Sequence, residues 1–501
     1  MPGWRSSQDR VVVIGSGWRF ASGISHYTYK LSCALADKYP VGALLMRRLI
    51  PRHLYPGRDR VGAQDVSAAY PVHIPVYDGV DWYWGRSLAR ARHWLNRQRP
   101  TVVVLQWWSG AVLHTYLRLA KYAARRGARV ILEWHEAQDT GEAGVPGARR
   151  YVQTLMPRLL STVDAHVMHS YFDVREIKAA FTLGDVPVRV IPHGPYDHLT
   201  GLTSQESQLG WHDSQAAAGT DRVPFRLLYF GVVRPFKGVE DLVTAFSGLD
   251  RELAIRFRLC VVGETWESWT APAEAIGRSP HSDLIERVDR YVSDTEVAAF
   301  FGRADAVVLP YHRSSSSGPL HIAMSAGLPV VTTAVGGLVE AVQRYPGAIL
   351  VPPHDPAALR QALSQLLERR GQRYPDPHSW ARTTAEYQAL ISEMNIARRD
   401  RDGKKRAWRE TRLGWRTQVN SAHSFRSASD RSRAPRTMRR GASGADFSPW
   451  RGGDHRTMIP WRSSSSAAAG RVRHCSGNCS PITQRSGTAT SRMPVGPQSS
   501  Q

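Results

Sequence analysis

Apolar and polar positions alternate with two different periods over the first part of the chain. Short apolar runs such as VVVIGSGW, TVVVLQWW and ARVILEWHE have the length and uniform hydrophobicity of buried parallel strands. Between them, TYKLSCALADKY and LHTYLRLAKYAARRG place apolar residues at helical spacing. This alternation predicts a doubly wound parallel α/β sheet, and we place this first Rossmann-like domain at residues 1–194.

The same rhythm stops and then restarts. Residues 195–221 are polar and without period, which is typical of a connection between domains. Strand-like FRLLYFG, FRLCVVGE and ADAVVLPY then alternate with helical segments up to LRQALSQLLERR. We therefore predict a second Rossmann-like domain at residues 222–370, followed by a C-terminal helix at residues 371–396.

The segment from Ala304 to Leu338 shows the clearest succession of elements. The runs AVVLP and LPVVT predict two buried strands on either side of a serine-rich loop and a short helix. Pro319 is favoured at the first helical position, with Ser317 or Gly318 as the cap. Gly327 is placed to end the helix in a left-handed conformation.

The start of that helix is a candidate anion site. The first amides of a helix have no partner within it, and the helix dipole favours negative charge there. Pro319 has no amide hydrogen, so the candidate donors are the amides of Gly318, Leu320 and His321. An ordinary strand, loop and helix with an unused helix start fits the same pattern equally well.

Beyond Ile396 the composition changes. Arg, Ser, Gly, Ala and Thr dominate residues 397–501 without apolar periodicity, which predicts a disordered tail because too little surface can be buried to offset ordering entropy. The 501 residues carry a net charge of +23, and the tail has 22 Lys and Arg against 6 Asp and Glu. Most of the charge thus lies outside the folded part. Contact with anionic lipid or nucleic acid and the absence of any function are both open for this tail.

The cysteines and the longest apolar runs bound the cellular setting. Cys33 and Cys260 lie in apolar patterns and are expected to be reduced, and Cys475 and Cys479 form a lone C-x3-C without a second ligand pair. No run reaches the roughly 18 apolar residues of a membrane span, and the N-terminus lacks a signal-like apolar core. We expect a cytoplasmic protein. Peripheral contact with the inner face of the membrane stays open, since residues 47–58 mix cations with apolar residues.

Glycines follow the first strand at Gly15, Gly17 and Gly23. A dinucleotide fingerprint fails here because Phe20 stands where the third glycine belongs. The open interpretations are a tight strand–helix turn and a loop that approaches a ligand closely.

Two cations follow a strand-end glycine in FGVVRPFKG. Arg234 and Lys237 would lie at the carboxyl end of a parallel strand that ends at Gly231, where ligands bind in such sheets. Arg grips a diphosphate through two donors, and Lys acts as a point charge. A pair of solvated loop cations is the alternative.

The segment LEWHEAQDTGE clusters His135 with Glu136 and Asp139 just past another strand. One histidine with staggered carboxylates matches no strong metal spacing, so acid–base chemistry or the binding of sugar hydroxyls suits it better. A polar loop without function is the alternative. His193, in the turn IPHG at the end of the first domain, is expected near the same cleft.

Together these motifs resemble the GT-B glycosyltransferases of family 4, also called glycosyltransferase group 1, and in particular their actinobacterial members. The resemblance covers roughly Val11 to Met394. The second half carries it most specifically, through YFGVVRPFKG, VVGE, YVSDTEVAAFFGRADAVVLPY and GLPVVTTAVGGL in the family's order and spacing. SGIS, EWHE and IPHG add support from the first half.

The resemblance implies two Rossmann-like domains that face a cleft, with a nucleotide sugar mainly on the second domain and the acceptor on the first. It assigns catalytic roles to His135, Arg234 and Lys237, and acceptor binding to Glu136, Asp139 and His193. Donor binding is expected from Gly15, Gly17, Gly23, Gly231, Gly263, Tyr291, Val292, Ser314, Ser317, Gly318 and Leu320. No metal and no cofactor are expected, because cationic side chains and a helix start would neutralise the leaving diphosphate.

The chain departs from the family where two glutamates usually stand, at Ser314 and Ile322, and Val232 replaces a usual arginine. The resemblance implies a retaining enzyme that transfers a hexose from a nucleoside diphosphate sugar to a glycan, lipid or metabolite. A catalytically inactive sugar-nucleotide or glycan binder is the alternative that the missing glutamates favour. A GT-B-type sugar-nucleotide epimerase is a further one. No specific nucleic-acid partner is expected.

Overall fold

The first half of the chain forms a seven-stranded sheet. The computed structural model describes residues 8–17, 23–48, 69–81, 85–136, 147–197, 199, 223–266 and 268–397. The strand order is β3-β2-β1-β4-β5-β6-β7, and every pairing is parallel. The strands are β1 (Val11–Ser16), β2 (Val41–Arg48), β3 (Val76–Asp81), β4 (Val102–Trp107), β5 (Arg129–Trp134), β6 (Ala165–Met168) and β7 (Val188–Val190).

Helices connect these strands, and the sheet is buried on both faces. They are α1 (Gly23–Ala36), α2 (Gly85–Gln98), α3 (Leu113–Arg125), α4 (Ala148–Leu160) and α5 (Tyr171–Ala180). Alternate residues of one strand face different cores, since Val12 and Ile14 of β1 belong to one hydrophobic cluster and Val11 and Val13 to the other. This two-sided burial explains why the strands read as continuous apolar runs in the sequence.

The second half repeats the architecture with six parallel strands. Their order is β10-β9-β8-β11-β12-β13. The strands are β8 (Phe225–Phe230), β9 (Phe257–Val262), β10 (Ile285–Val288), β11 (Ala306–Leu309), β12 (Val330–Thr333) and β13 (Ala348–Val351). The helices are α6 (Val239–Ser247), α7 (Arg251–Ala254), α8 (Ala271–Arg278), α9 (Asp294–Arg303), α10 (Gly318–Ser325), α11 (Leu338–Val342) and α12 (Pro356–Leu366).

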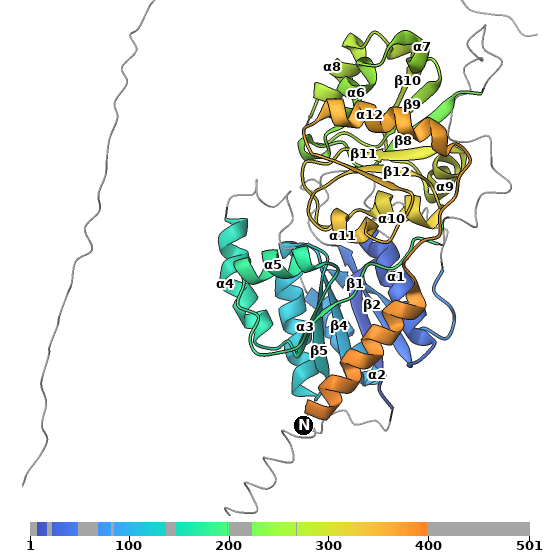
Figure 1. Ribbon diagram of the computed structural model, residues 1–501. Helices are drawn as coiled ribbons and strands as arrows, with labels where there is room; N and C mark the ends of the chain where they lie inside the picture. Colours follow the sequence, from blue (N-terminus) through green and yellow to red (C-terminus); the bar gives the residue numbers. More distant parts are fainter. Residues whose placement is uncertain are drawn as a thin grey trace, which may run out of the picture. The chain divides into compact units, whose positions relative to one another are not determined.

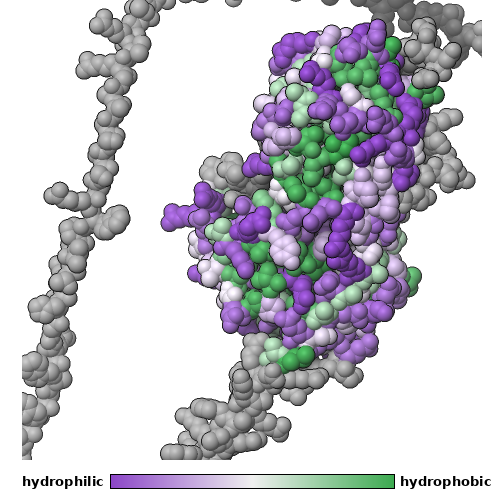
Figure 2. Space-filling view, viewed as in Figure 1, coloured by the Kyte–Doolittle hydropathy of each residue, from purple (hydrophilic) through white to green (hydrophobic). Residues whose placement is uncertain are grey.

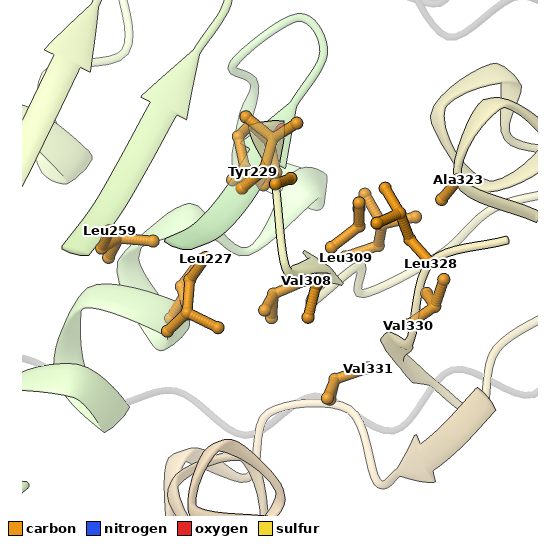
Figure 3. Packing of buried hydrophobic residues seen from close by; sticks show 14 of the residues in the cluster. Leu227, Tyr229, Leu259, Val308, Leu309, Ala323, Leu328, Val330 and Val331 are labelled. Atoms are coloured by element: carbon orange, nitrogen blue, oxygen red, sulfur yellow. The ribbon is translucent and has the colours of Figure 1, made fainter. Parts of the chain in front are cut away.

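One continuous core holds this second sheet and its helices together. Figure 3 shows its centre, where Leu227 and Tyr229 of β8 lie near Leu259 of β9 and Val308 and Leu309 of β11. All five side chains are fully buried. At about 25 cal/mol per Å² of apolar surface, such burial is the main stabilising contribution to the domain.

The chain returns to the first sheet in its last described helix, residues 380–397, the orange helix in the lower half of Figure 1. Tyr387, Leu390 and Ile391 are buried in the same core cluster as Val11 and Val13 of β1. Arg129 of β5 donates to the carbonyl oxygen of Ile391 at 3.1 Å. The two sheets are therefore linked by two crossings of the chain, one after β7 and one after α12.

The predicted fold class, two doubly wound parallel sheets, is confirmed. Within the segment Ala304–Leu338, Ser317 is the cap of α10 and Gly327 is left-handed with φ 71°, both as expected. Nearly all of the proposed linker and tail, residues 200–222 and 398–501, lies outside the described residues.

The surface of the described part is mixed. Figure 2 shows hydrophobic residues in separate patches surrounded by hydrophilic ones. Among the helices of the described residues, none has both the length and the apolar character needed to cross a bilayer.

Candidate active site

A pocket of about 390 Å³ lies at the point where the strand order of the second sheet reverses, between β8 and β11. Ligands of open α/β sheets bind at such switch points because the loops separate there. The second domain contributes Gly231, Lys237 and Gly318, and the first contributes Gly23 and Glu136. We call this space the β8–β11 pocket.

Two glycines at strand ends allow the floor of the β8–β11 pocket to form. Gly231 follows β8 with φ 133°, and Gly263 follows β9 with φ 147°. A Cβ atom added to Gly263 would lie 1.9 Å from the carbonyl oxygen of Gly231. Both residues line the pocket, so a side chain at Gly263 would separate the two strand ends.

Lys237 brings a positive charge to the β8–β11 pocket. Its loop is a 3-10 turn from Pro235 to Lys237, and its Nζ atom lies 3.7 Å from the centre of the Tyr311 ring, a cation–π contact. The pKa of Lys237 is lowered to about 8, mainly by burial; Glu136 opposes this shift and Arg234 adds to it. The ammonium group is thus largely charged at neutral pH but poorly solvated, and an incoming anion would relieve this cost.

Arg234 does not line the pocket that its neighbour Lys237 lines. It is buried, with its guanidinium 5.0 Å from the centre of the Phe236 ring and 5.5 Å from that of Trp266. Its charge still acts on Lys237, as the pKa of that lysine shows. The structure therefore separates two cations that the sequence analysis grouped together.

The serine-rich loop before α10 is held against a glycine pair. A Cβ atom on Gly336 would lie 1.8 Å from the carbonyl oxygen of Ser314, and one on Gly337 would lie 2.1 Å from that of Ser315. The Ser314 hydroxyl donates to the carbonyl oxygen of Ser316 at 2.7 Å. Ser314 is therefore engaged within its own loop and does not line the β8–β11 pocket.

The start of α10 differs from the expectation in one respect. The hydroxyl of Ser317 accepts the amide hydrogen of Leu320 at 3.3 Å, and the Leu320 side chain is in the core. The amide of His321 donates to the carbonyl oxygen of Ser317 at 3.2 Å. Of the three expected amides, those of Leu320 and His321 already have partners, whereas Gly318 lines the pocket.

His135 belongs to a separate, buried arrangement at the carboxyl ends of β4, β5 and β6. Its Nε2 atom lies 2.6 Å from Oε1 of Gln106, and its Nδ1 atom lies 3.2 Å from Nε2 of His169. Gln106 also contacts Glu133, whose other carboxylate oxygen accepts the Tyr27 hydroxyl at 2.7 Å. Each of these side chains is less than one tenth exposed.

The hydrogen bonds among Gln106, Glu133, His135 and His169 require one proton more than two neutral imidazoles and an ionised carboxylate would carry. The Nδ1 atom of His169 lies 3.0 Å from the carbonyl oxygen of Ile191, which only accepts, so Nδ1 is protonated. A neutral His169 then accepts at Nε2, and His135 donates from Nδ1. If the Gln106 NH2 group faces His135, a neutral His135 accepts from it at Nε2. The Gln106 amide oxygen then faces Glu133, which must carry the proton to donate to it.

If the Gln106 amide oxygen faces His135 instead, the additional proton is on the imidazole pair of His135 and His169, and Glu133 is ionised. Burial raises the pKa of Glu133 to about 7 and lowers the pKa of His169 to about 4. The pKa of His135 is also held well below its usual range by burial and by His169 and His193. These shifts favour neutral histidines and, below about pH 7, a protonated Glu133.

Further histidines extend the arrangement toward the second domain. The rings of His193 and His321 stack with centroids 4.6 Å apart, and the ring of His193 lies 5.3 Å from that of His169. We call His135, His169, His193 and His321 the histidine cluster. The last three of them line a second cavity of about 300 Å³, together with Arg344 and Arg382.

Several contacts cross between the two domains near these sites. The Glu340 carboxylate of α11 accepts the amides of Tyr171 and Phe172, at the start of α5, at 2.7 and 2.8 Å. His26 of α1 lies 3.3 Å from Asp294 of α9, and both line the β8–β11 pocket. A carboxylate at a helix start interacts favourably with its free amides and dipole.

The structure places the expected residues in several different settings. Nine of them line the β8–β11 pocket: Gly23, Glu136, Gly231, Lys237, Gly263, Tyr291, Val292, Ser317 and Gly318. His135 and His193 lie in the histidine cluster, and Asp139 is outside the described residues. Gly15 packs against Thr28, and Gly17 donates its amide to the carbonyl oxygen of Met46, away from the pocket.

Gln106, His169 and the side chain of His321 were not predicted from the sequence. Gln106 lies inside an apolar strand and His169 just after one, where the only signal was a polar residue in a buried run. Glu133, His135 and His169 present ligand atoms within 4.8 Å of one another. The segment around His135 shows only one histidine in the sequence, because His169 comes from a different strand.

Comparison with known proteins gives matches over both halves. The model of a family described as glycosyl transferase 4-like domain matches residues 22–194, and that of glycosyl transferases group 1 matches residues 224–369. Glycogen synthase of Mycobacterium tuberculosis is 34% identical over 69% of this chain and 82% of its own length. D-inositol 3-phosphate glycosyltransferase of Kineococcus radiotolerans is 27% identical over 56% of this chain and 63% of its own length.

Solved structures share the fold at low sequence identity. Sucrose-phosphate synthase of Thermosynechococcus elongatus matches with a TM-score of 0.54 and 17% identity, over 78% of this chain and 99% of that protein. HepE of Anabaena, in complex with UDP-glucose, matches with a TM-score of 0.51 and 12% identity, over 78% and 99%. With its two matching domains and its 34% identical relative, this chain belongs to the group 1 glycosyltransferases of family 4 and has the GT-B fold.

Proposed function

We propose that this glycosyltransferase binds a nucleoside diphosphate sugar in the β8–β11 pocket and transfers its hexose, with retention, to a glycan, lipid or metabolite. The observation that carries the proposal is Lys237, a poorly solvated cation at a strand end in a pocket of about 390 Å³. Sites of this size suit a small-molecule ligand. HepE of Anabaena, which shares the fold, was solved with UDP-glucose.

The lining residues suggest how the donor would lie. Lys237 would contact the diphosphate, with Gly318 at the start of α10 beside it. Tyr291 and Val292 line the pocket next to Gly263 and would contact the base through their backbone. Arg234 does not line the pocket and would act on the site only through the effect of its charge on Lys237.

In the reaction, the bond between the sugar C1 atom and the diphosphate oxygen breaks, and an acceptor hydroxyl oxygen bonds to C1 on the same face. The hydroxyl proton passes to the departing diphosphate. Lys237 stabilises the negative charge that develops there, which is the contribution that a preorganised cation makes in a poorly solvated site. In this mechanism Lys237 neutralises the developing charge on the diphosphate, so no metal ion takes part.

The acceptor would approach from the first domain. Glu136 lines the β8–β11 pocket, and His135 lies directly before it at the end of β5. The carbonyl oxygen of His135 accepts the Ser315 hydroxyl at 3.5 Å, which joins this strand end to the serine-rich loop of the second domain. The side chain of His135 would act by orienting this strand end.

The test is a thermal-shift screen of UDP, GDP and ADP sugars, followed by a turnover assay with the best donor. Lys237→Ala should abolish the rise in Tm that the nucleotide sugar causes, and it should lower kcat/KM by about 10²- to 10³-fold. Lys178→Ala, which removes an exposed lysine of α5, is the matched control and should change neither. Equal turnover by Lys237→Ala and the parent chain would disprove the assignment.

A catalytically inactive binder is a second candidate, because Ile322 lines the β8–β11 pocket where the family usually has a glutamate. Ile322 cannot accept a hydrogen bond from a ribose hydroxyl. Calorimetric binding of UDP or GDP without turnover of any donor and acceptor pair would favour the binder. Conversion of free donor without an acceptor would instead indicate an epimerase.

A further inference from the structure

Three residues outside the β8–β11 pocket gather metal-ligating atoms at the carboxyl edge of the second sheet. Asp241 lies in the first turn of α6, His312 follows β11, and His354 follows β13. None of the three lines the β8–β11 pocket. We propose that Asp241, His312 and His354 bind a divalent transition-metal ion of the Zn²⁺ class.

The distances suit such an ion. Nε2 of His312 lies 2.9 Å from Oδ2 of Asp241, Nδ1 of His354 lies 4.0 Å from the same oxygen, and all three ligand atoms are within 4.8 Å of one another. A tetrahedral ion with bonds of about 2.1 Å separates its ligand atoms by roughly 3.4 Å. The observed separations bracket this value, so small side-chain rotations would complete the site.

The ligand types select the class of ion. Two imidazoles and one carboxylate suit Zn²⁺, Co²⁺ or Ni²⁺, whereas Mg²⁺ and Ca²⁺ prefer oxygen ligands throughout. The His354 side chain is 66% exposed, so solvent reaches the group and a water molecule can supply the fourth ligand. The site is thus open on one side and formed by protein on the other.

The backbone at His354 provides a separate observation. This residue has φ 56°, a left-handed conformation that favours glycine, and it lies between Pro353 and Pro356 in the sequence PPHDP. Its ring lies against that of His312, with centroids 3.7 Å apart and an angle of 31° between the ring planes. A histidine held in an unfavourable conformation, with its ring beside a second histidine, points to a role for the imidazole.

The loop that carries Lys237 packs closely against His312. Its amide donates to the carbonyl oxygen of Phe236 at 2.9 Å, which fixes the loop after β11 to the loop that carries Lys237. Gly238, with φ 61°, passes so close that an added Cβ atom would lie 2.8 Å from Nε2 of His312. A bound ion would therefore tie together α6, the loop after β11 and the loop after β13, next to Lys237.

The experiment titrates ZnCl2 into the metal-free full-length chain and follows Tm and calorimetric affinity. Cys475→Ser and Cys479→Ser are introduced throughout, because those thiols would compete for the ion. The parent should gain Tm with one Zn²⁺ bound. His312→Ala should weaken the affinity at least tenfold without loss of the fold.

His354→Gly sharpens the test, because it should raise the Tm of the metal-free chain by relieving the left-handed strain and yet lose the Zn²⁺-dependent gain. Arg99→Gly is the matched control, since Arg99 also has positive φ, at 48°, and lies far from any of the three ligands in the sequence. It should keep the full Zn²⁺-dependent gain. The proposal is overturned if Zn²⁺ leaves the parent unchanged, or raises the Tm of parent, His312→Ala and His354→Gly equally.

Discussion

Lys237 places a positive charge in the β8–β11 pocket on a half-buried side chain, whereas the Glu133 carboxylate beside the histidine cluster is fully buried. The pocket is formed largely by short motifs of the second domain. The cluster collects single residues from the ends of β5, β6 and β7 and from α10. Burial is the largest cause of the pKa shifts in both regions.

Burial has opposite consequences for a lysine and for a glutamate. At Lys237 it produces a cation that an anionic ligand would stabilise, so the cost is recovered on binding. At Glu133 it favours the neutral acid, and the hydrogen bonds of Gln106, His135 and His169 distribute a single proton. The β8–β11 pocket thus favours binding of an anion, whereas the surroundings of Glu133 favour uncharged side chains.

The largest expected effect concerns the shape of the pocket. Gly263→Ala would place a Cβ atom 1.9 Å from the Gly231 carbonyl oxygen at a backbone conformation with φ 147°. The free energy of unfolding, from urea denaturation, should fall by about 3 kcal/mol or more.

Gly147→Ala is the matched control for Gly263→Ala. It also has positive φ, at 79°, but an added Cβ atom meets nothing within 4 Å. It should cost only about 1 kcal/mol. Equal losses in the two variants would show that strand-end packing adds nothing to the strain.

A second prediction uses the raised pKa of Glu133, about 7 in the folded chain against the usual 4.5. The folded state holds this proton more tightly, so its contribution is present at pH 4 and is lost as the pH rises through about 7. Glu133→Gln should remove this dependence, and its unfolding free energy should improve relative to the parent by about 2–3 kcal/mol between pH 5 and 8. Parallel pH curves for parent and variant, in urea denaturation, would contradict a proton on Glu133.

A third prediction tests the charge on Lys237, whose pKa is about 8. Because the charged form is needed, kcat/KM should fall about tenfold per pH unit above pH 8, since this ratio reports ionisation of the free enzyme. Lys237→Arg should keep activity at pH 9 to 9.5, because a guanidinium stays charged. If kcat/KM of Lys237→Arg still falls above pH 8, the ionisation responsible belongs to another group.

The smallest effect is expected at the contact between the domains. Glu340→Ala removes the carboxylate that accepts two amides at the start of α5 and should cost about 1 kcal/mol of unfolding free energy. Glu340→Gln should lose less, because its amide oxygen still accepts one of the two. Thermal and urea unfolding measure both, and a larger loss in the glutamine variant would argue against this contact.

The sequence was sufficient for the order of strands and helices. Continuous apolar runs such as VVVIGS and FRLCVV are strands of the two sheets because both of their faces are buried. Pro319 and Gly327 mark α10 because their conformations are set by the residue itself. Nine of the expected residues line one pocket, and seven of them come from the second domain, because motifs at strand ends meet at the carboxyl edge of its parallel sheet.

Other features depended on the tertiary structure. Gln106 and His169 are distant in sequence from Glu133, so no local pattern predicts that they share a proton with it. Arg234 and Lys237 are close in sequence, yet the turn from Pro235 directs one into aromatic packing and the other into the pocket.

The architecture can thus be predicted from the amino-acid sequence, because hydrophobic period, proline and glycine act locally along the chain. The contacts between polar groups, and their protonation states, follow from the three-dimensional fold. Hydrogen bonds and desolvation depend on neighbours in space, and those neighbours come from different strands.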